Sequence, residues 1–171
     1  MSTSIDADGL RELQEPLKGR YRSEPDAAQV TLEADGDLDE GVACSVQTGQ
    51  ALVRAGLHPG TGGDGASACS GDMLLQALVA CAGVTMRAVA TSIGIAVSGS
   101  VHAEGDLDWR GTLAVDKQTP VGFSAIRLRF DLDSDASDEE LATLERLTER
   151  YCVVFQTLAQ APRLSTSTNR L

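Results

Sequence analysis

The sequence predicts an α+β domain built around one long apolar helix. Residues 72–93 carry two adjoining apolar strips at spacings of three and four, with almost no charge between Asp72 and Arg87. This pattern is typical of a helix buried around most of its circumference. Alternating stretches on both sides indicate strands, and a second helical stripe covers residues 138–159. A chain of 171 residues with 42% apolar residues has enough material for one domain with a full core.

The ends of the first helix carry recognisable signals. Ser70 can cap its start, and Asp72 places a negative charge in the first turn, where the helix dipole favours one. Gly94 follows Ile93 and is a natural stop. Cys81 lies halfway along this helix.

The residues before this helix predict an antiparallel meander followed by a loop. Short strands are expected at 29–34, 42–46 and 50–55, with turn residues at 36–41. The glycine-rich segment 57–70 enters the helix and could cradle a phosphate. It lacks the lysine of a P-loop, so we favour a flexible entry that lets backbone approach closely.

Two strands are expected after the helix. Residues 95–108 alternate and predict a strand with a bulge at Gly99 or Gly105. Residues 121–133 alternate more regularly and predict the clearest strand of the chain.

The last third of the chain predicts a second long helix. Ser137 and Glu140 have the spacing of a capping box, and an apolar stripe that includes Cys152 continues to about Ala159. Residues 164–168 could form a final strand.

The N-terminal residues differ in composition from the rest. Leu10, Leu13 and Leu17 predict a short amphipathic helix, which we expect to be a loosely docked appendage. We therefore divide the chain into an N-terminal helical extension, 1–27, and one domain, 28–171.

The charge balance excludes several classes of partner. The formal net charge is −11, with 25 acidic and 14 basic residues, which argues against nucleic acid and against anionic lipid. No basic segment precedes an apolar run at the N-terminus, and Gln76, Thr85 and Arg87 interrupt the apolar helix. We expect a cytoplasmic protein with no signal peptide and no membrane span.

Two of the four cysteines are candidates for chemistry. Cys81 and Cys152 each fall on the stripe that their helix would bury, so packing the helices together could bring the sulfurs into contact. Such a pair can cycle between dithiol and disulfide if the Cα atoms approach to about 4.4–6.8 Å. A buried cysteine considered alone is more often a small core residue than a catalytic one.

The other thiols and the histidines carry weaker signals. Cys69 lies just before the helix, where the dipole would lower its pKa, but we favour a loop thiol without a role. Cys44 is expected to pack in a strand. His58 and His102 stand apart from any cysteine, so the sequence predicts no metal site and no cofactor.

Three segments together resemble the OsmC/Ohr family. Residues 62–81 combine a glycine-rich loop with a helix of the form acidic-x-Leu-Leu-x-Ala-Leu-x-x-Cys. Residues 122–128 and 151–153 resemble the second half of the family. The resemblance implies an OsmC-like fold, an intertwined homodimer in which antiparallel sheets wrap around two long central helices.

The resemblance also implies a redox activity associated with oxidative stress. In the peroxidase members the first cysteine attacks an organic hydroperoxide and becomes a sulfenic acid, which the second resolves to a disulfide. A dithiol reductant such as the lipoyl group of a lipoylated protein then reduces the disulfide. Cys81 would be the peroxidatic thiol and Cys152 the resolving thiol.

Several departures from the family pattern indicate a divergent branch. The peroxidases have a Glu ten residues before the first cysteine, where this chain has Gly71; the neighbouring acid, Asp72, is shorter and one place later. Val153 follows Cys152, where the family usually has a proline. The arginine that assists the first cysteine has three candidates: Arg20, Arg22 and Arg54.

Two other functions stay open. The first is a binding or redox-sensing protein of the same fold without peroxidase turnover. The second is a thiol-dependent enzyme that acts on another sulfur or acyl substrate. The cysteine pair favours the peroxidase, with Asp72 and Cys69 as possible supporting groups, while Gly71 favours the alternatives.

Overall fold

The structure is a computed structural model of the chain. It describes residues 6–9, 11–12, 14–15, 23, 52–114 and 116–170, together with the backbone of 36–38 and 43–47. The expected strand at 29–34, the apolar positions Leu10, Leu13 and Leu17, and the boundary between 27 and 28 lie outside the described residues.

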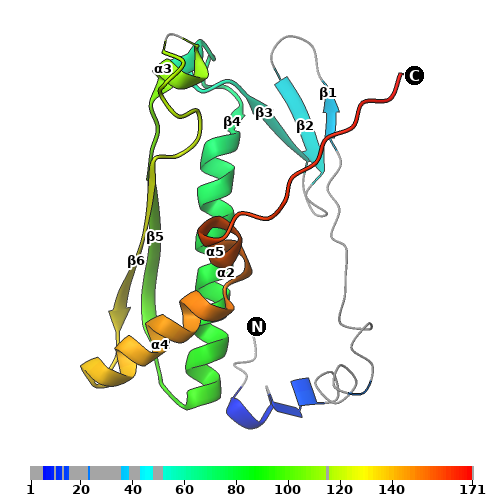
Figure 1. Ribbon diagram of the computed structural model, residues 1–171. Coiled ribbons are helices and arrows are strands. Elements are labelled where there is room, and N and C mark those ends of the chain that lie inside the picture. The colour runs from blue at the N-terminus through cyan, green and yellow to red at the C-terminus, as the bar shows by residue number, and fades with distance from the viewer. Residues whose placement is uncertain are drawn as a thin grey trace.

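One long helix, α2 (Ser70–Ile93), runs through the centre of the molecule (Figure 1). Along its length it packs against strand β5 (Ser98–Asp106) and against helices α4 (Asp138–Tyr151) and α5 (Val153–Ala159). Strand β6 (Ala125–Asp133) pairs with β5 to form a sheet on one side of α2. The predicted α+β class and the central position of this helix are confirmed.

The helix α2 ends as predicted but begins two residues earlier. Its first residue is Ser70, and Cys69 occupies the N-cap position without a side-chain capping bond, so the predicted Ser70 cap is wrong. Asp72 lies in the first turn. Gly94 ends the helix with φ 76°, a left-handed conformation in which its N–H reaches the carbonyls of Ala90 and Thr91.

In this chain α2 is buried on one side only, which corrects the expectation of burial around most of its circumference. Its buried residues are Leu78, Ala82, Met86, Val89 and Ala90. Val84, on the opposite face, is 72% exposed, whereas Leu74 and Ile93, near the two ends of the helix, are 38% and 41% exposed.

By length and apolar composition α2 also satisfies the requirements of a membrane span, which the sequence analysis did not anticipate. A core helix of a globular protein meets the same requirements. Because α2 packs against a sheet and two helices, it fits the description of a core helix.

A four-stranded sheet precedes α2. Its strands occur in the order β1-β2-β3-β4. The first three pair antiparallel, which confirms the pairing expected between 42–46 and 50–55, while β4 pairs parallel to β3. The bounds are β1 Gly36–Leu38, β2 Ala43–Gln47, β3 Leu52–Gly56 and β4 Ala68–Cys69.

Two segments of this region differ from the prediction. The residues of β1 were expected to form a turn, and the segment expected to be only a loop contains β4 and a 3-10 helix, η2 (Pro59–Thr61). Turn-forming residues such as Gly36 and Asp37 do not prevent a short edge strand when the neighbouring strand supplies the hydrogen bonds.

The second sheet contains β5 and β6, paired antiparallel without interruption from Ser98 opposite Asp133 to Asp106 opposite Ala125. The expected bulge at Gly99 or Gly105 is therefore wrong. Gly99 instead has φ 133°, and a Cβ at this position would lie 2.0 Å from the carbonyl oxygen of Asp131 across the strand pair. The glycine permits this close approach without breaking the register.

The second helical stripe forms two helices, not one. α4 begins with the predicted capping box, in which the Ser137 and Glu140 side chains each bond the other's backbone N–H. The helix stops at Cys152, whose φ of −73° and ψ of 109° are extended, and α5 starts at the next residue. The prediction of one continuous helix to Ala159 is wrong at Cys152.

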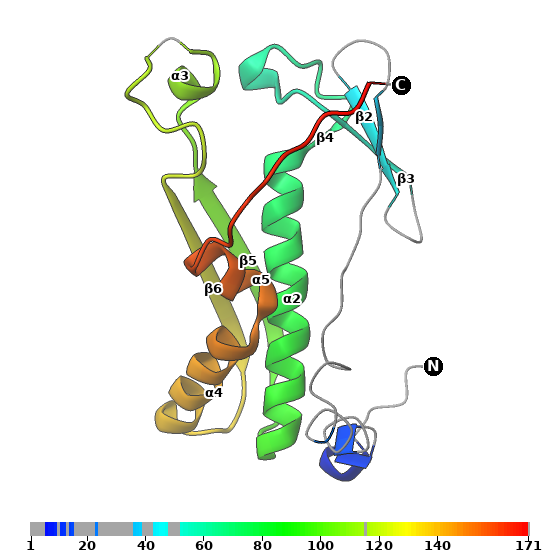
Figure 2. The ribbon, with the colours of Figure 1, turned by 45° about the vertical axis from the view of Figure 1, so that its right-hand side comes forward.

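The core lies where the lower half of α2 meets α4 and the β5–β6 sheet (Figure 2). Its buried members are Met86, Val89, Ala90, Val97 and Leu144. Ile95, Phe130, Leu132, Leu141 and Leu147 pack around them. This cluster fixes the angle at which α4 crosses α2 and so positions the end of α4.

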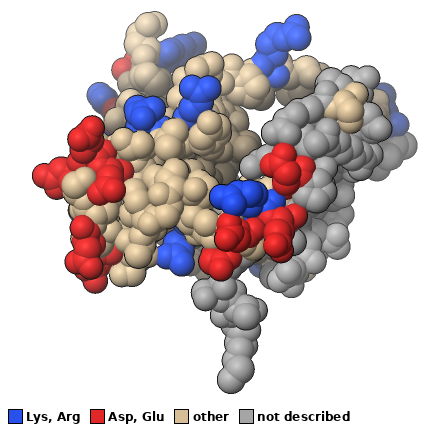
Figure 3. Space-filling model, turned by 90° about the horizontal axis from the view of Figure 1, so that it is seen from below, with Lys and Arg blue, Asp and Glu red and all other residues tan. Residues whose placement is uncertain are grey.

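The C-terminal segment extends from this body. Residues 161–170 run away from α5 without pairing to a strand, and Leu164 is 90% exposed, so the expected final strand is not formed within the described chain. A space-filling view from below shows one group of acidic side chains at the left edge and a second near the middle, beside basic side chains, with a mostly uncharged area between the two groups (Figure 3).

Candidate active site

Cys81 and Cys152 lie next to each other where α2 meets the break between α4 and α5. The sulfur of Cys81, in the middle of α2, forms a hydrogen bond with the Cys152 side chain. Cys81 is partly buried, whereas Cys152 is 1% exposed. The helix packing therefore brings together the two thiols that the sequence singled out.

The break at Cys152 surrounds the Cys81 sulfur with donors. The first amides of a helix have no partner within it. Those of Val153 and Val154, at the start of α5, both hydrogen-bond the sulfur of Cys81. The side chain of Thr85, one turn further along α2, also hydrogen-bonds this sulfur.

These donors decide the protonation state of Cys81. Partial burial alone would raise its pKa, but the hydrogen bonds from Val154, Cys152, Thr85 and Val153 together outweigh burial and lower the pKa below that of an ordinary thiol. Hydrogen bonds to a charged acceptor are roughly twice as strong as those to a neutral one, so they favour the thiolate.

The partner thiol shifts in the opposite direction. Burial raises the pKa of Cys152, and the charge that develops on neighbouring Cys81 raises it further. When the pair loses its first proton, the negative charge is therefore favoured on Cys81 and the remaining proton on Cys152. This is the arrangement of a nucleophile with a protonated partner in contact.

An apolar cavity of about 320 Å³ is lined by residues one helical turn from each cysteine, though not by the cysteines themselves. Leu78, on the turn of α2 before Cys81, and Phe155, three residues after Cys152, line one side. Phe123, Leu128 and Leu158 line the rest, with other residues at the start of β6 and the end of α5. A cavity of this size and lining suits the apolar group of a small organic molecule.

The acidic residues near the start of α2 do not reach the pair. Asp72 lies nine residues before Cys81, which on a helix is about 13 Å along the axis and on the opposite face. A Cβ added at Gly71 would lie 3.5 Å from the Phe123 ring and 3.6 Å from the Cys69 sulfur, so this position faces apolar groups. Within this chain neither position contributes to the ionisation of Cys81.

The remaining candidates also lie apart from Cys81. Cys69 is twelve residues earlier, about 18 Å along the same helix axis. Cys44 is on β2, opposite Ala55. Arg54 is exposed on β3, while Arg20 and Arg22 lie outside the described residues.

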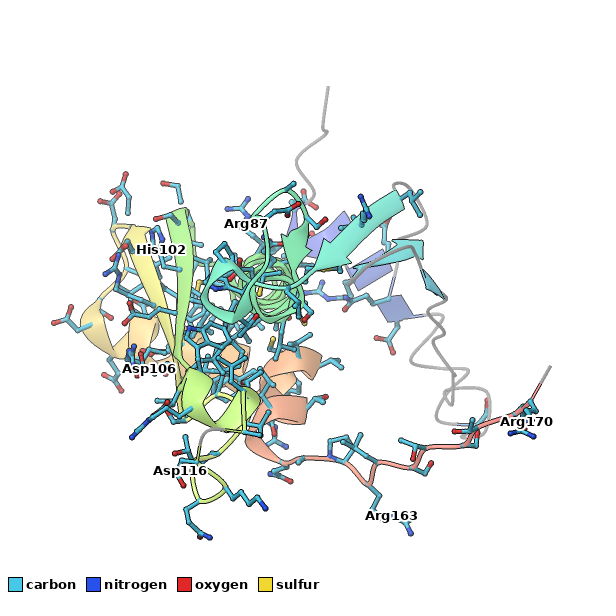
Figure 4. The ribbon with its side chains drawn as sticks, turned by 90° about the horizontal axis from the view of Figure 1, so that it is seen from above. Arg87, His102, Asp106, Asp116, Arg163 and Arg170 are labelled. Atoms are coloured by element: carbon cyan, nitrogen blue, oxygen red, sulfur yellow. The ribbon has the colours of Figure 1, made fainter. Side chains whose placement is uncertain are left out.

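The two histidines have other surroundings. The His58 ring stacks on Trp109 at 4.9 Å, and its Nδ1 accepts the Gly60 N–H. His102, on β5, lies 3.4 Å from Asp131 (Figure 4). In the part of the chain that the structure describes, no group of three His, Cys, Asp or Glu side chains is arranged to hold a metal ion.

A family model for OsmC-like proteins matches residues 62–167, which include both cysteines and every element from β4 to α5. The chain belongs to the OsmC family. None of the curated proteins compared with it matches.

Several solved structures share the fold of this chain. An OsmC-like protein from Mycoplasma pneumoniae aligns with a TM-score of 0.65 at 16% identity, covering 78% of this chain and 90% of that one. A hypothetical protein from Aquifex aeolicus VF5 aligns with a TM-score of 0.60 at 15% identity, covering 78% of this chain and 90% of that one. An OsmC-like protein of unknown function from Vibrio cholerae aligns with a TM-score of 0.56 at 14% identity, covering 75% of this chain and 94% of that one.

Sequence reasoning missed the groups that bind the Cys81 sulfur. Thr85 was named only as an interruption of the apolar helix, and the amides of Val153 and Val154 were assigned to the interior of a continuous helix. One available signal was the proline that usually follows the second cysteine in the OsmC family. Proline favours the first position of a helix, so it marks the start of a new helix after Cys152.

Proposed function

We propose that this OsmC-family protein is a thiol peroxidase that reduces organic hydroperoxides with Cys81 and Cys152. The observation that carries the proposal is the hydrogen-bonded pair, in which the pKa of Cys81 is lowered and that of Cys152 is raised. A thiolate is the form that attacks a peroxide, and a thiol in contact is what resolves the product.

In the first step the Cys81 thiolate attacks the terminal oxygen of the hydroperoxide. An S–O bond forms and the O–O bond breaks, so the sulfur is oxidised to a sulfenic acid and the hydroperoxide is reduced by two electrons. The alkoxide that leaves takes a proton from water, which gives the alcohol and hydroxide. The amides of Val153 and Val154 hold the attacking sulfur in place.

In the second step Cys152 gives its proton to hydroxide and attacks the sulfur of the sulfenic acid. An S–S bond forms, the S–O bond breaks, and hydroxide leaves. The existing hydrogen bond between the two side chains means that little movement separates them from bonding distance. One turnover therefore converts one hydroperoxide and the Cys81 thiolate–Cys152 thiol pair to an alcohol, hydroxide and a disulfide.

A dithiol reductant, such as the lipoyl group of a lipoylated protein, completes the cycle. It supplies two electrons and two protons, reduces the disulfide and is itself oxidised to a cyclic disulfide. The substrate binds with its apolar group in the cavity lined by Leu78 and Phe155, which lies one helical turn from each sulfur.

The protein acts as a homodimer in this proposal. The side of α2 that carries Ala77, Ala80 and Val84 is exposed in one chain although it is apolar. Within the described part of the chain, residues 161–170 pair with no strand and the two sheets are small. A second copy can cover α2 and extend the sheets, which would bury the helix as its composition requires.

The proposal is tested by stopped-flow consumption of cumene hydroperoxide, with dihydrolipoamide as reductant. We expect rapid turnover in the wild type, none in Cys81→Ser, and one turnover followed by a stall in Cys152→Ser. Cys69→Ser is the matched control and should keep wild-type turnover. A wild-type rate no faster than that of a free thiol would contradict peroxidase function and favour a redox-sensing role.

A further inference from the structure

The ring of Phe123, which lines the cavity near the cysteine pair, lies between two glycines. A Cβ at Gly105, on β5, would lie 2.6 Å from the Cδ1 and Cε1 atoms of this ring, so the ring fills the space that a side chain there would take. A Cβ at Gly71, in the first turn of α2, would lie 3.5 Å from the Cζ atom of the ring. The ring therefore reaches from β5 to the start of α2.

The backbone next to Phe123 is held at the end of β5. The N–H of Ser124, the following residue, donates to the Asp106 carbonyl at 2.9 Å. The Ser124 hydroxyl donates to the same carbonyl at 3.2 Å. From Ala125 onward the chain continues as β6, paired with β5. Phe123 is therefore anchored within two residues of a paired strand, which determines where its ring lies.

The ring forms the end of the cavity that points toward the start of α2. Leu78 and Phe155 line the cavity at positions three residues from one cysteine each. Gly71 is seven residues before Leu78, about 10 Å along the helix axis, and the Phe123 ring reaches it. The ring thus stands between the cavity and the start of α2, whereas Cys81 lies on the other side of Leu78.

We propose that Phe123 determines how large an apolar group the cavity accepts. A bound ligand ends against the ring, so a longer group is excluded. Beyond the ring the surroundings stay apolar, because the Cys69 sulfur and the Leu107 Cδ1 atom would lie 3.6 and 3.9 Å from a Cβ at Gly71. Removing the ring therefore extends the cavity toward the start of α2, into a space that suits additional carbon atoms.

The selection among hydroperoxides rests on the proposed peroxidase function. The size limit of the cavity does not, because binding needs no turnover. Both are measured with a matched pair of compounds, cumene hydroperoxide and para-diisopropylbenzene monohydroperoxide, which carries one additional isopropyl group. The corresponding alcohols, which cannot be reduced by the thiols, are the ligands for the binding measurement.

Binding of the two alcohols is measured by displacement of N-phenyl-1-naphthylamine, a neutral dye whose fluorescence rises in apolar sites. The wild type should bind the smaller alcohol more tightly. In Phe123→Ala the preference should shift toward the larger alcohol by about tenfold, because the additional isopropyl group gains apolar contact. Phe123→Leu keeps an apolar side chain of intermediate size and should shift the preference less, in the same direction. An unchanged preference in both variants would overturn the inference.

A second pair of variants tests the contact of the ring with β5. Gly105→Ala places a methyl group where the ring lies, so the ring must move and the preference between the alcohols should change. In the Phe123→Ala background the same methyl group meets no ring, and Gly105→Ala should have little further effect. Gly122→Ala is the matched control, because a Cβ there meets no described atom within 4 Å, and it should bind as the wild type does. Equal changes from Gly105→Ala with and without the ring would contradict the role of Phe123.

Turnover of the two hydroperoxides is compared in the same variants. A shift of kcat/KM toward the larger hydroperoxide in Phe123→Ala, together with the shift in binding, supports both proposals. A shift in binding by a protein that consumes no hydroperoxide even as wild type supports the role of Phe123 and contradicts the peroxidase function. Rapid turnover with the wild-type preference kept in every variant contradicts the role of Phe123 alone.

Discussion

The Cys152 side chain hydrogen-bonds the sulfur of Cys81 across the junction of α2 with the break between α4 and α5. Because the break leaves two backbone amides without helical partners, the same junction also supplies donors to the Cys81 sulfur. The junction therefore shifts the pKa values of these two cysteines in opposite directions.

The different states predict a selective reaction with alkylating reagents. At pH 7 iodoacetamide should modify Cys81 first, since the pKa of Cys81 is lowered and that of Cys152 is raised. The thiolate is the deprotonated form, so reactivity of Cys81 should fall as the pH decreases through its pKa. Peptide mass spectrometry after partial alkylation measures this, and faster modification of Cys152 would contradict the assignment.

Removing the Cys152 donor should alter Cys81. In Cys152→Ala the Cys81 sulfur loses one hydrogen bond, and its pKa should rise. In Cys152→Ser a hydroxyl can replace the thiol as donor, so the pKa should rise less. The same alkylation profile measures both variants, and an equal pKa in Cys152→Ala and wild type would show that the hydrogen bond does not stabilise the thiolate.

Phe155→Ala should weaken binding of an aromatic hydroperoxide. The ring lines the cavity beside the cysteine pair, and its loss removes apolar contact worth about 1–2 kcal/mol, or about 5–30-fold in KM. The value of kcat should change little, because the thiols are untouched. Steady-state kinetics with cumene hydroperoxide provides the measurement.

Leu113→Ala is the control for this substitution, since Leu113 is 52% exposed outside the cavity. Its kinetics should match the wild type. If Phe155→Ala and Leu113→Ala gave the same KM, the substrate would bind elsewhere.

Val84→Asp should dissociate the proposed dimer. Val84 is 72% exposed on the apolar side of α2, and a carboxylate buried there by a second copy would lack a partner. Sedimentation velocity should show a dimer for the wild type and a monomer for the variant. Val121→Asp, at a site 62% exposed before β6, is the control; a monomeric wild type would contradict the dimer.

Leu144→Ala should strongly destabilise the fold. Leu144 is 0% exposed in the core between α2 and α4, and such truncations lower the free energy of unfolding by about 2–5 kcal/mol. Leu164→Ala, in the exposed tail, should change it by less than about 0.5 kcal/mol. Urea denaturation monitored by circular dichroism measures both, and similar values would contradict the packing described.

Local patterns in the sequence predicted most of the elements. The apolar strips of α2, the alternation of β6 and the capping box at Ser137 are each encoded by residues close in the chain, so periodicity and capping rules found them. The positions of Cys81 and Cys152 on the buried stripes likewise predicted that the thiols could meet.

The break at Cys152 could not be found this way. The apolar stripe continues through it at helical spacing, and Val153 gives no local stop signal. The break depends on packing against α2, because the backbone amides of Val153 and Val154 bond the Cys81 sulfur there and do not continue the hydrogen bonds of α4. The exposed side of α2 was also missed, because helical periodicity does not distinguish burial by the same chain from burial by a second copy.

The central claim, that Cys81 and Cys152 form one redox pair, is tested most directly by non-reducing mass spectrometry. The reduced protein is treated with one equivalent of cumene hydroperoxide, quenched with acid and digested. We predict a single linked pair of peptides that contains Cys81 and Cys152, with Cys69 still a free thiol. A protein that stays fully reduced, or a disulfide that joins Cys81 to Cys69, would contradict the account.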